Sequence, residues 1–373
     1  RDNMNNYGYV QVTMTTMLNR TIPNIPVILL ICFSLLLCFR FLYIKKFTFF
    51  YILTSILLLA TSFVVFMSTG GTNFLLYSLL ILLLYDADID VILKTYVIVS
   101  GAIVLGVFVL SILGVIPNLQ FAQVRSAGLV IRNSFGFIYP TDFASHCFYL
   151  FIAWGYILRK RLIILRTLVG LSLSFFIIKF CDARLNALSV LLATVIFILM
   201  YVTKERKFKI YGILPYSAAI FSFIMFYLTY FFTWSSSLFV SLNNLFSMRL
   251  FLGKNAIDTY DIHLFGTTGV KFIGYGGTTE SVYSYNYVDS SYIQMLFYYG
   301  VVPVVLLVLI YVIASKRFYK QGMFLFLALL SLITVNCMIE AFWVRPGYNI
   351  FMFALFASLL PNQYKTKDRI ELS

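Results

Sequence analysis

The sequence predicts an all-α polytopic membrane protein. Hydrophobic residues make up 61% of the chain and charged residues only 11%, under half the roughly 25% that is usual in soluble domains. The apolar residues gather in uninterrupted runs of about 20 residues, the length that crosses a hydrocarbon core as a helix. Runs such as 47–67 show no polar alternation, which argues against a transmembrane β-barrel. A soluble globular domain is excluded.

Eleven apolar runs define the predicted spans, and together they form a single integral membrane domain over residues 1–373. They lie near 26–43, 47–67, 72–85, 95–116, 137–158, 167–181, 186–202, 211–232, 289–313, 322–338 and 347–360. An odd number of spans with an outer N-terminus suggests a further helix before Arg1, which would make twelve. We therefore expect 11 to 12 transmembrane helices.

Charge in the connections predicts the orientation. Of the 28 Lys and Arg residues, 18 fall in one alternate set of short connections, and the other ten fall in the set that contains the long loops. Positive charge is retained on the cytoplasmic side, so residues 1–25 are expected outside and the tail 362–373 inside. The net charge of +14 then reflects topology, and we expect no nucleic-acid partner. The five cysteines lie in or beside apolar runs, without the spacing of a metal or redox motif.

One connection is long enough to cover the outer membrane surface. Residues 233–287 form this large extracytoplasmic loop, which is rich in Gly, Thr, Ser, Tyr and Asn. Aromatic rings interleaved with amides and carboxylates suit a carbohydrate ligand, although aromatic residues are also common at membrane interfaces. Asp258, Asp261 and His263 have a spacing that only permits a metal site, and we expect none.

Charged residues next to apolar spans mark the candidate site, because an Arg or Asp near a helix centre costs about 2.5–3.5 kcal/mol on insertion scales. Arg125 and Arg132 are seven apart, so they could share one helical face and contact a phosphate group. Snorkelling to lipid headgroups is the alternative. Asp142 and His146 are four apart and would be neighbours in a helix, either as a structural hydrogen bond or as an acid–base pair.

Two brief outer turns each carry an acid and a base. Asp182 and Arg184 interrupt apolar sequence with so little loop that they must sit at membrane depth, as a mutual pair or with a shared ligand. Glu340 and Arg345 flank another short turn, where an interfacial salt bridge and a functional role are both open.

The chain resembles the O-antigen ligase and polymerase superfamily, the Wzy-type polysaccharide polymerases. The resemblance covers most of the chain, with about a dozen helices, Arg-bearing outer segments and one large outer loop late in the sequence. Arg249-x-x-x-Gly-x-x-Ala256 followed by Gly266 looks like the family's loop pattern, and Asp289-Ser-Ser-Tyr-Ile-Gln looks like the start of its next helix. The stretch 133–144 looks like exopolysaccharide polymerases. Related ligases often have His-Asn where this chain has Asp289-Ser290.

The resemblance implies a GT-C-like fold and metal-independent glycosyl transfer at the outer face of the bacterial cytoplasmic (inner) membrane, without a cofactor. The donor would be a glycan on undecaprenyl pyrophosphate, and the acceptor the sugar end of a second lipid-linked repeat. A chain-length regulator and a flippase would be partners. Expected catalytic residues are Asp289, Arg249 and His263; expected substrate-binding residues are Arg125, Arg132, Asp142, His146, Asp182, Arg184 and Arg345.

Two other functions stay open. A ligase would use the same donor chemistry and change only the acceptor. A flippase for lipid-linked oligosaccharides would also need outer cations, but it predicts a charged path toward the cytoplasmic half, and little charge lies within the spans. No internal repeat of the kind that many transporters carry is visible.

Overall fold

The computed structural model describes residues 25–43, 49–85, 87–125, 128–159, 162–204, 206–274 and 285–357. These residues form a bundle of mostly α-helices with one two-stranded sheet, which confirms the all-α class for the bundle itself. The predicted outer N-terminus, except Ile25, and the predicted tail 362–373 lie outside the described residues, as do the last residues of the predicted span 347–360.

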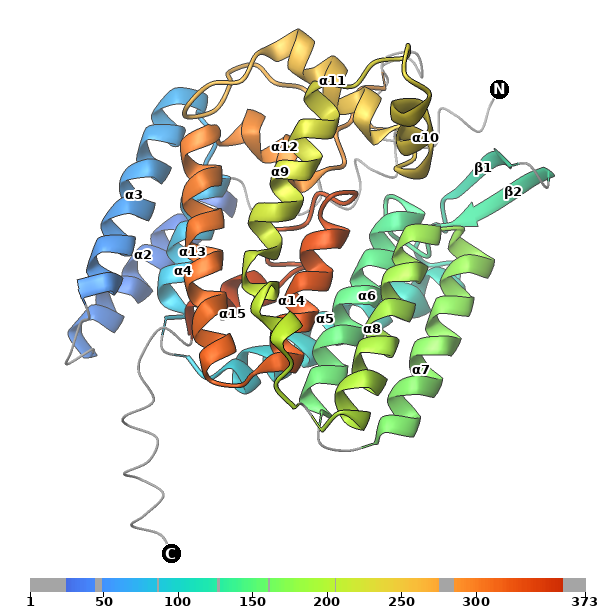
Figure 1. Ribbon diagram of the computed structural model, residues 1–373, viewed down its shortest axis with the longest axis horizontal. Coiled ribbons are helices and arrows are strands. Elements are labelled where there is room, and N and C mark those ends of the chain that lie inside the picture. The colour runs from blue at the N-terminus through green and yellow to red at the C-terminus, as the bar shows by residue number, and fades with distance from the viewer. Residues whose placement is uncertain are drawn as a thin grey trace, which may run out of the picture.

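The elements follow one another along the chain as Figure 1 labels them. They are α2 (Ile25–Tyr43), α3 (Phe49–Thr69), α4 (Asn73–Leu83), α5 (Ile89–Ile112), β1 (Gln120–Arg125), β2 (Gly128–Asn133), α6 (Pro140–Ile157), α7 (Ile163–Phe176), a π-helical segment η1 (Ile177–Cys181), α8 (Arg184–Val202), the 3₁₀ turns η2 (Lys209–Gly212) and η3 (Leu214–Tyr216), α9 (Ser217–Tyr230), α10 (Ser237–Leu245), α11 (Arg249–Tyr260), α12 (Ser291–Tyr298), α13 (Val301–Lys320), α14 (Phe324–Asn336) and α15 (Phe351–Ala357).

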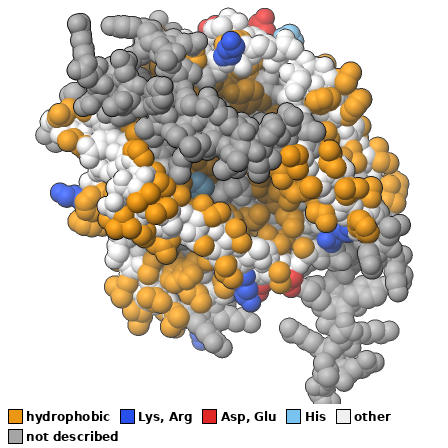
Figure 2. Space-filling model, turned by 180° about the vertical axis from the view of Figure 1, so that it is seen from behind, with side chains coloured by type: hydrophobic (Ala, Val, Ile, Leu, Met, Phe, Trp, Pro, Cys, Tyr) orange, Lys and Arg blue, Asp and Glu red, His pale blue; other side chains and the backbone are white. Residues whose placement is uncertain are grey.

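Six helical stretches among the described residues are long and apolar enough to cross a membrane. They are Tyr51–Thr69, Ile89–Ile112, Ile163–Cys181, Arg184–Val202, Lys209–Tyr230 and Val301–Lys320. Three further apolar helices are shorter. Hydrophobic side chains also form extensive patches on the described surface of the face shown in Figure 2, as lipid contact requires. The chain is therefore a multi-pass membrane protein, and the larger count of 11 to 12 spans stays a prediction.

The connections separate to two ends of the bundle (Figure 1). One end carries α10, α11, α12 and the β1–β2 hairpin, and we call it the loop end. The opposite end, here the basic end, carries the turns after α6, α8 and α13. The described basic residues of these turns, namely Arg159, Lys204, Arg206, Lys207 and Lys320, all belong to the set predicted to be cytoplasmic, so this part of the set gathers at one end of the bundle.

Three predicted features differ from the structure. Arg125 and Arg132 do not share a helical face, because they lie on the antiparallel strands of the hairpin, where Arg132 pairs with Phe121 and Arg125 with Gly128. The predicted span 289–313 is broken at Tyr299 and Gly300 into the short helix α12 and the long helix α13. The predicted loop 233–287 is itself partly helical and contains α10 and α11.

The break between α12 and α13 fixes the path of the large loop. Gly300 has a φ of +92°, and a Cβ there would lie 2.3 Å from the Gly266 backbone nitrogen. The amides of Val301 and Val302 donate to the carbonyls of His263 and Leu264 at 3.1 and 3.0 Å. Two chain segments therefore cross so closely that only glycine fits, and the loop is held against the start of α13.

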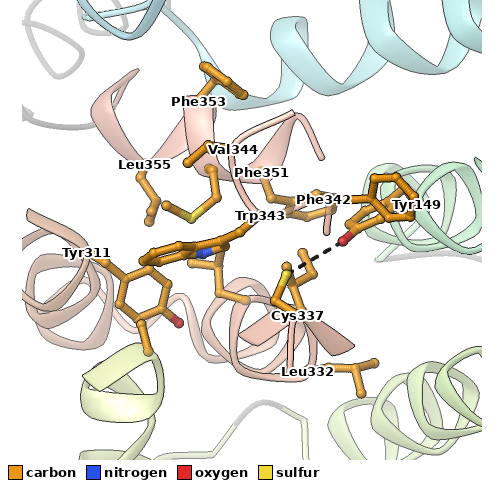
Figure 3. Close-up of a cluster of buried hydrophobic side chains, with 14 of the residues drawn as sticks. Tyr149, Tyr311, Leu332, Cys337, Phe342, Trp343, Val344, Phe351, Phe353 and Leu355 are labelled. Atoms are coloured by element: carbon orange, nitrogen blue, oxygen red, sulfur yellow. Dashed lines mark hydrogen bonds between the residues drawn. The ribbon is translucent and has the colours of Figure 1, made fainter. Parts of the chain in front are cut away.

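The segment between α14 and α15 is anchored by a buried tryptophan. Trp343 is fully buried, and its ring lies 5.3 Å from the ring of Tyr292 and 6.4 Å from that of Tyr311. Figure 3 shows this cluster, where the Tyr149 hydroxyl points toward the Cys337 sulfur. Packing of this kind fixes the backbone of the segment and, with it, the charged residues Glu340 and Arg345 on either side of Trp343.

Candidate functional site

An arginine and two carboxylates from distant parts of the chain meet at the loop end. Arg249 is the first residue of α11, Asp289 lies just before α12, and Glu340 follows α14. The Arg249 Nη2 atom lies 3.4 Å from Asp289 Oδ2 and 4.0 Å from Glu340 Oε1. We call these three residues the Arg249 cluster.

Backbone contacts hold the guanidinium of Arg249 in place. Its Nε donates to the Ile339 carbonyl at 2.6 Å and its Nη1 to the Phe246 carbonyl at 3.2 Å. Only 10% of the Arg249 side chain and 6% of the Glu340 side chain are exposed, against 26% for Asp289. Asp289 is therefore the member of the cluster that a ligand could reach from outside.

The two carboxyl groups compete for one cation. Burial raises the pKa of Glu340 to about 8; Arg249 opposes this rise, and the negative charge of Asp289 adds to it. Burial also raises the pKa of Asp289, against the opposing charges of Arg249 and Arg345. One guanidinium cannot fully compensate two buried carboxylates, so the pKa of both groups is raised. With a pKa of about 8, Glu340 carries a proton near neutral pH.

Arg345 lies near this cluster but pairs differently from the sequence-based prediction. A salt bridge between Glu340 and Arg345 is not formed, since Glu340 shares Arg249 instead. The Arg345 Nη2 donates to Gln294 Oε1 at 3.0 Å and to the Tyr287 hydroxyl at 3.5 Å. Glu340 and Arg345 are close in sequence, but each is paired with residues from other parts of the fold and not with the other.

Asp142 and His146 do not form the hydrogen bond that their spacing permits. Asp142 Oδ2 instead accepts from the Tyr139 backbone amide at 3.3 Å and caps the start of α6. The His146 ring stacks on Tyr348 at a centroid distance of 3.9 Å, and Tyr348 stacks on Phe342 at the same distance. His146 Nδ1 has no hydrogen-bond partner among the described residues. The structure thus supports packing for His146 and a helix cap for Asp142.

The hairpin and the turn between α7 and α8 bring a second charged group together. Arg132 donates from Nε to the Cys181 carbonyl at 3.0 Å and from Nη1 to Gln123 Oε1 at 3.1 Å. Beside Cys181, the buried Asp182 accepts from Arg184 Nε at 3.0 Å, and the Arg184 side chain is 60% exposed. Asp182 and Arg184 thus form the mutual pair, one of the two arrangements expected for them, and a shared ligand stays a prediction. The charge of Arg132 also opposes the rise in the pKa of Glu340.

Another predicted site residue, His263, does not join the Arg249 cluster. His263 is exposed, and its carbonyl, rather than its ring, makes the described hydrogen bond, to Val301. For Arg125 the structure describes the backbone alone. Asp258 pairs with Lys254 at 2.5 Å, and no group of three His, Cys, Asp or Glu side chains among the described residues could hold a metal ion.

Four contributors lie outside the set of predicted site residues. Glu340 is visible in the sequence as an acid between two apolar runs, but its pairing with Arg249 is not. Tyr287, Gln294 and Tyr348 carry no sequence signal that separates them from ordinary interface residues. Their role follows only from the contacts with Arg345 and His146.

Comparison with known proteins adds no assignment. No protein-family model, no curated protein and no solved structure matches this chain.

Proposed function

We propose that the protein is a polysaccharide polymerase of the outer face of a bacterial cytoplasmic membrane. It would transfer a growing glycan from a polyprenyl-pyrophosphate donor to the sugar end of a second lipid-linked repeat. The single observation that carries the proposal is the Arg249 cluster, a buried cation with one accessible and one enclosed carboxyl group at the loop end of a membrane bundle. The family resemblance of the sequence supplies the substrate class.

The charges suit this chemistry. Asp289 accepts the proton of the acceptor hydroxyl as that oxygen bonds to the donor's anomeric carbon. The bond from that carbon to the pyrophosphate oxygen breaks, and its electron pair leaves with the pyrophosphate. Arg249, Arg132 and Arg184 stabilise the negative charge that develops on the leaving group, as guanidinium groups do through bidentate contacts. No metal or cofactor is required by this route.

Neutral Glu340 has a defined part in the same step. A second anionic carboxylate on Arg249 would cancel the cation that the leaving group needs. A protonated Glu340 leaves more of the Arg249 charge for pyrophosphate and for Asp289. We therefore assign Glu340 as a positioning residue and Asp289 as the catalytic base.

The test combines a gene deletion with a purified reaction. Deletion should abolish long glycan chains and leave single lipid-linked repeats on the outer leaflet. The protein in detergent should then extend lipid-linked repeats, while Asp289→Asn loses at least 100-fold of the rate, within the usual contribution of a general base. Lys254→Gln, outside the cluster, serves as the matched control.

Other outcomes would replace the proposal. Long chains that persist on the lipid carrier after deletion would identify a ligase. Single repeats trapped on the inner leaflet, together with no polymerisation in detergent, would identify a flippase.

A further inference from the structure

A cavity of about 290 Å³ lies next to the Arg249 cluster, between the start of α4, the helix α12 and the segment 341–345. Polar groups from all three parts line it, namely Asn73, Gln294 and Arg345. Three tyrosines, Tyr77, Tyr298 and Tyr299, supply aromatic surface. Its volume lies at the lower limit of the roughly 300–1,000 Å³ of pockets for drug-sized ligands, which suits a single sugar ring.

The lining matches the two needs of a sugar. The apolar faces of a pyranose pack against aromatic rings, and its hydroxyls need donors and acceptors such as amides and phenols. Asn73 and Gln294 supply amides, and the tyrosines supply both rings and hydroxyls. An apolar lipid tail would leave these groups without partners, at a cost of about 1–3 kcal/mol for each buried group.

Arg345 gives this cavity a preference for negative charge. Both hydrogen bonds that it makes among the described residues come from Nη2, and both go to neutral side chains. Within the described part of the chain, no carboxylate lies within the 4.0 Å of an ion pair with Arg345. A guanidinium has five N–H donors, so Nε and Nη1 remain for a carboxylate in the bidentate geometry that arginine favours.

A second cavity is lined by a cation that already forms an ion pair. It measures about 390 Å³ and is lined by Tyr230, Lys254 and Asp258, among others. There Lys254 already pairs with Asp258 at 2.5 Å. The two cavities differ in that Arg345 has only neutral hydrogen-bond partners among the described residues, while the carboxylates of Asp142 and Asp289 feel its charge from beyond ion-pair distance. Direct contact with the guanidinium is therefore open to the carboxylate of a ligand.

We propose that the cavity at Arg345 binds one hexuronic-acid residue, with the sugar carboxylate on the Arg345 guanidinium and the ring against the tyrosines. The inference rests on the proposed function for its biological meaning, because it makes an acidic sugar part of the repeat unit. Binding itself needs no turnover, so it can be tested separately.

The experiment uses Trp343, which lines the cavity, as a reporter. The chain has three tryptophans, so Trp154→Phe together with Trp234→Phe leaves Trp343 alone. The full-length variant in detergent is titrated with glucuronate, galacturonate, glucose, galactose and pyrophosphate while Trp343 emission is followed. We expect a saturable response to at least one hexuronate, with an affinity at least ten-fold above that for the matching neutral sugar.

Two variants test the assigned contact. Arg345→Gln should remove the ten-fold preference for the acidic sugar. Gln294→Glu keeps Arg345 but gives it an internal carboxylate in place of the amide at 3.0 Å, so it should abolish hexuronate binding as well. Because the second variant retains the arginine, it covers the case in which Arg345→Gln does not fold. Lys254→Gln at the second cavity should change nothing.

Several results would overturn the inference. Equal affinity for acidic and neutral sugars would do so, as would no saturable response, or pyrophosphate binding that displaces the hexuronate. If hexuronate binds as expected but gene deletion leaves glycan chains intact, the polymerase proposal fails and the acidic-sugar site stands. If deletion gives the polymerase result and hexuronate does not bind, only the cavity assignment fails.

Discussion

The guanidinium of Arg249 lies 3.4 Å from the carboxylate of Asp289, and this contact joins the first residue of α11 to the residue that precedes the α12 region. It closes the segment 249–289, because the chain leaves from one member of this pair and returns to the other. The same guanidinium reaches Glu340 from beyond α14, so one side chain ties three segments together.

Loss of Arg249 should therefore affect both stability and activity. Arg249→Gln leaves two buried carboxyl groups without their cation, and breaking a buried pair in this way costs about 3–5 kcal/mol. We expect a lower melting temperature in detergent and no polymer product. Asp289→Asn in the same chain should recover part of the stability, since it removes the carboxylate that has lost its cation. Equal melting temperatures for Arg249→Gln and the parent protein would refute the cluster as a structural unit.

Stability should depend on pH through Glu340. Its pKa is about 8 in the folded protein, against an ordinary value of 4.5. Between these values the folded chain holds a proton that the unfolded chain has lost, so stability falls as the pH rises from 4.5 to 8. Each unit of difference in pKa corresponds to about 1.4 kcal/mol, so the free energy of unfolding should fall by a few kcal/mol over this pH range.

The measurement is the melting temperature of the parent protein and of Glu340→Gln across this pH range. The variant should show a flatter profile, because its amide does not titrate. Asp258→Asn, which removes a largely exposed carboxylate, is the control and should follow the parent. A parent profile parallel to that of Glu340→Gln would contradict an enclosed, protonated Glu340.

His146 should be replaceable by another flat ring. Its ring stacks on Tyr348 at 3.9 Å, so His146→Phe should keep the free energy of unfolding within about 1.5 kcal/mol of the parent, as volume-conserving swaps do. His146→Ala should lose more, because it opens a gap beside Tyr348. Glycan chain length should likewise survive His146→Phe. If His146→Phe shortened the glycan chains at an unchanged melting temperature, an acid–base role for His146 would be supported instead.

Gly300 should not accept a side chain. A Cβ there would meet the Gly266 nitrogen at 2.3 Å and the Leu264 carbonyl oxygen at 2.4 Å, both backbone atoms. Gly300→Ala should separate the loop from α13 and lower both stability and yield. Gly106→Ala in α5 is the matched control, because a Cβ there meets nothing within 4 Å. The measurement is the rate at which a protease cleaves the loop, which should be higher in Gly300→Ala. Equal cleavage rates for the two variants would show that the close approach at Gly300 does not hold the loop in place.

The variant Arg184→Ala should show whether Arg184 contacts the substrate or only stabilises the fold. Its side chain is 60% exposed, but that of its partner Asp182 is only 6% exposed, so Arg184→Ala should lower the melting temperature because it leaves a buried carboxylate without this cation. If it holds pyrophosphate, the same variant should lower the rate in detergent at least ten-fold and shorten the glycan. An unchanged rate would restrict Arg184 to pairing with Asp182.

Residues near one another in the sequence were predicted with mixed success. The pair Asp182–Arg184 follows from the sequence, because so short a turn leaves each charge few other partners. The pair Glu340–Arg345 does not, since each finds a better partner elsewhere in the fold. Arg125 and Arg132 are seven apart and suggest a helical face, whereas local pairing of their strands places them in a hairpin.

The sequence by itself determined the class of the protein and the two ends of the bundle. Apolar run length and the asymmetry of Lys and Arg are sufficient for this, because the bilayer imposes both on every spanning chain. It also marked Arg249 and Asp289 as charges at the loop end. Only the tertiary structure decided that these two meet, that Glu340 shares their cation, and that Arg345 faces a cavity. Such contacts join distant segments, and their distances depend on how the helices pack rather than on any local period in the chain.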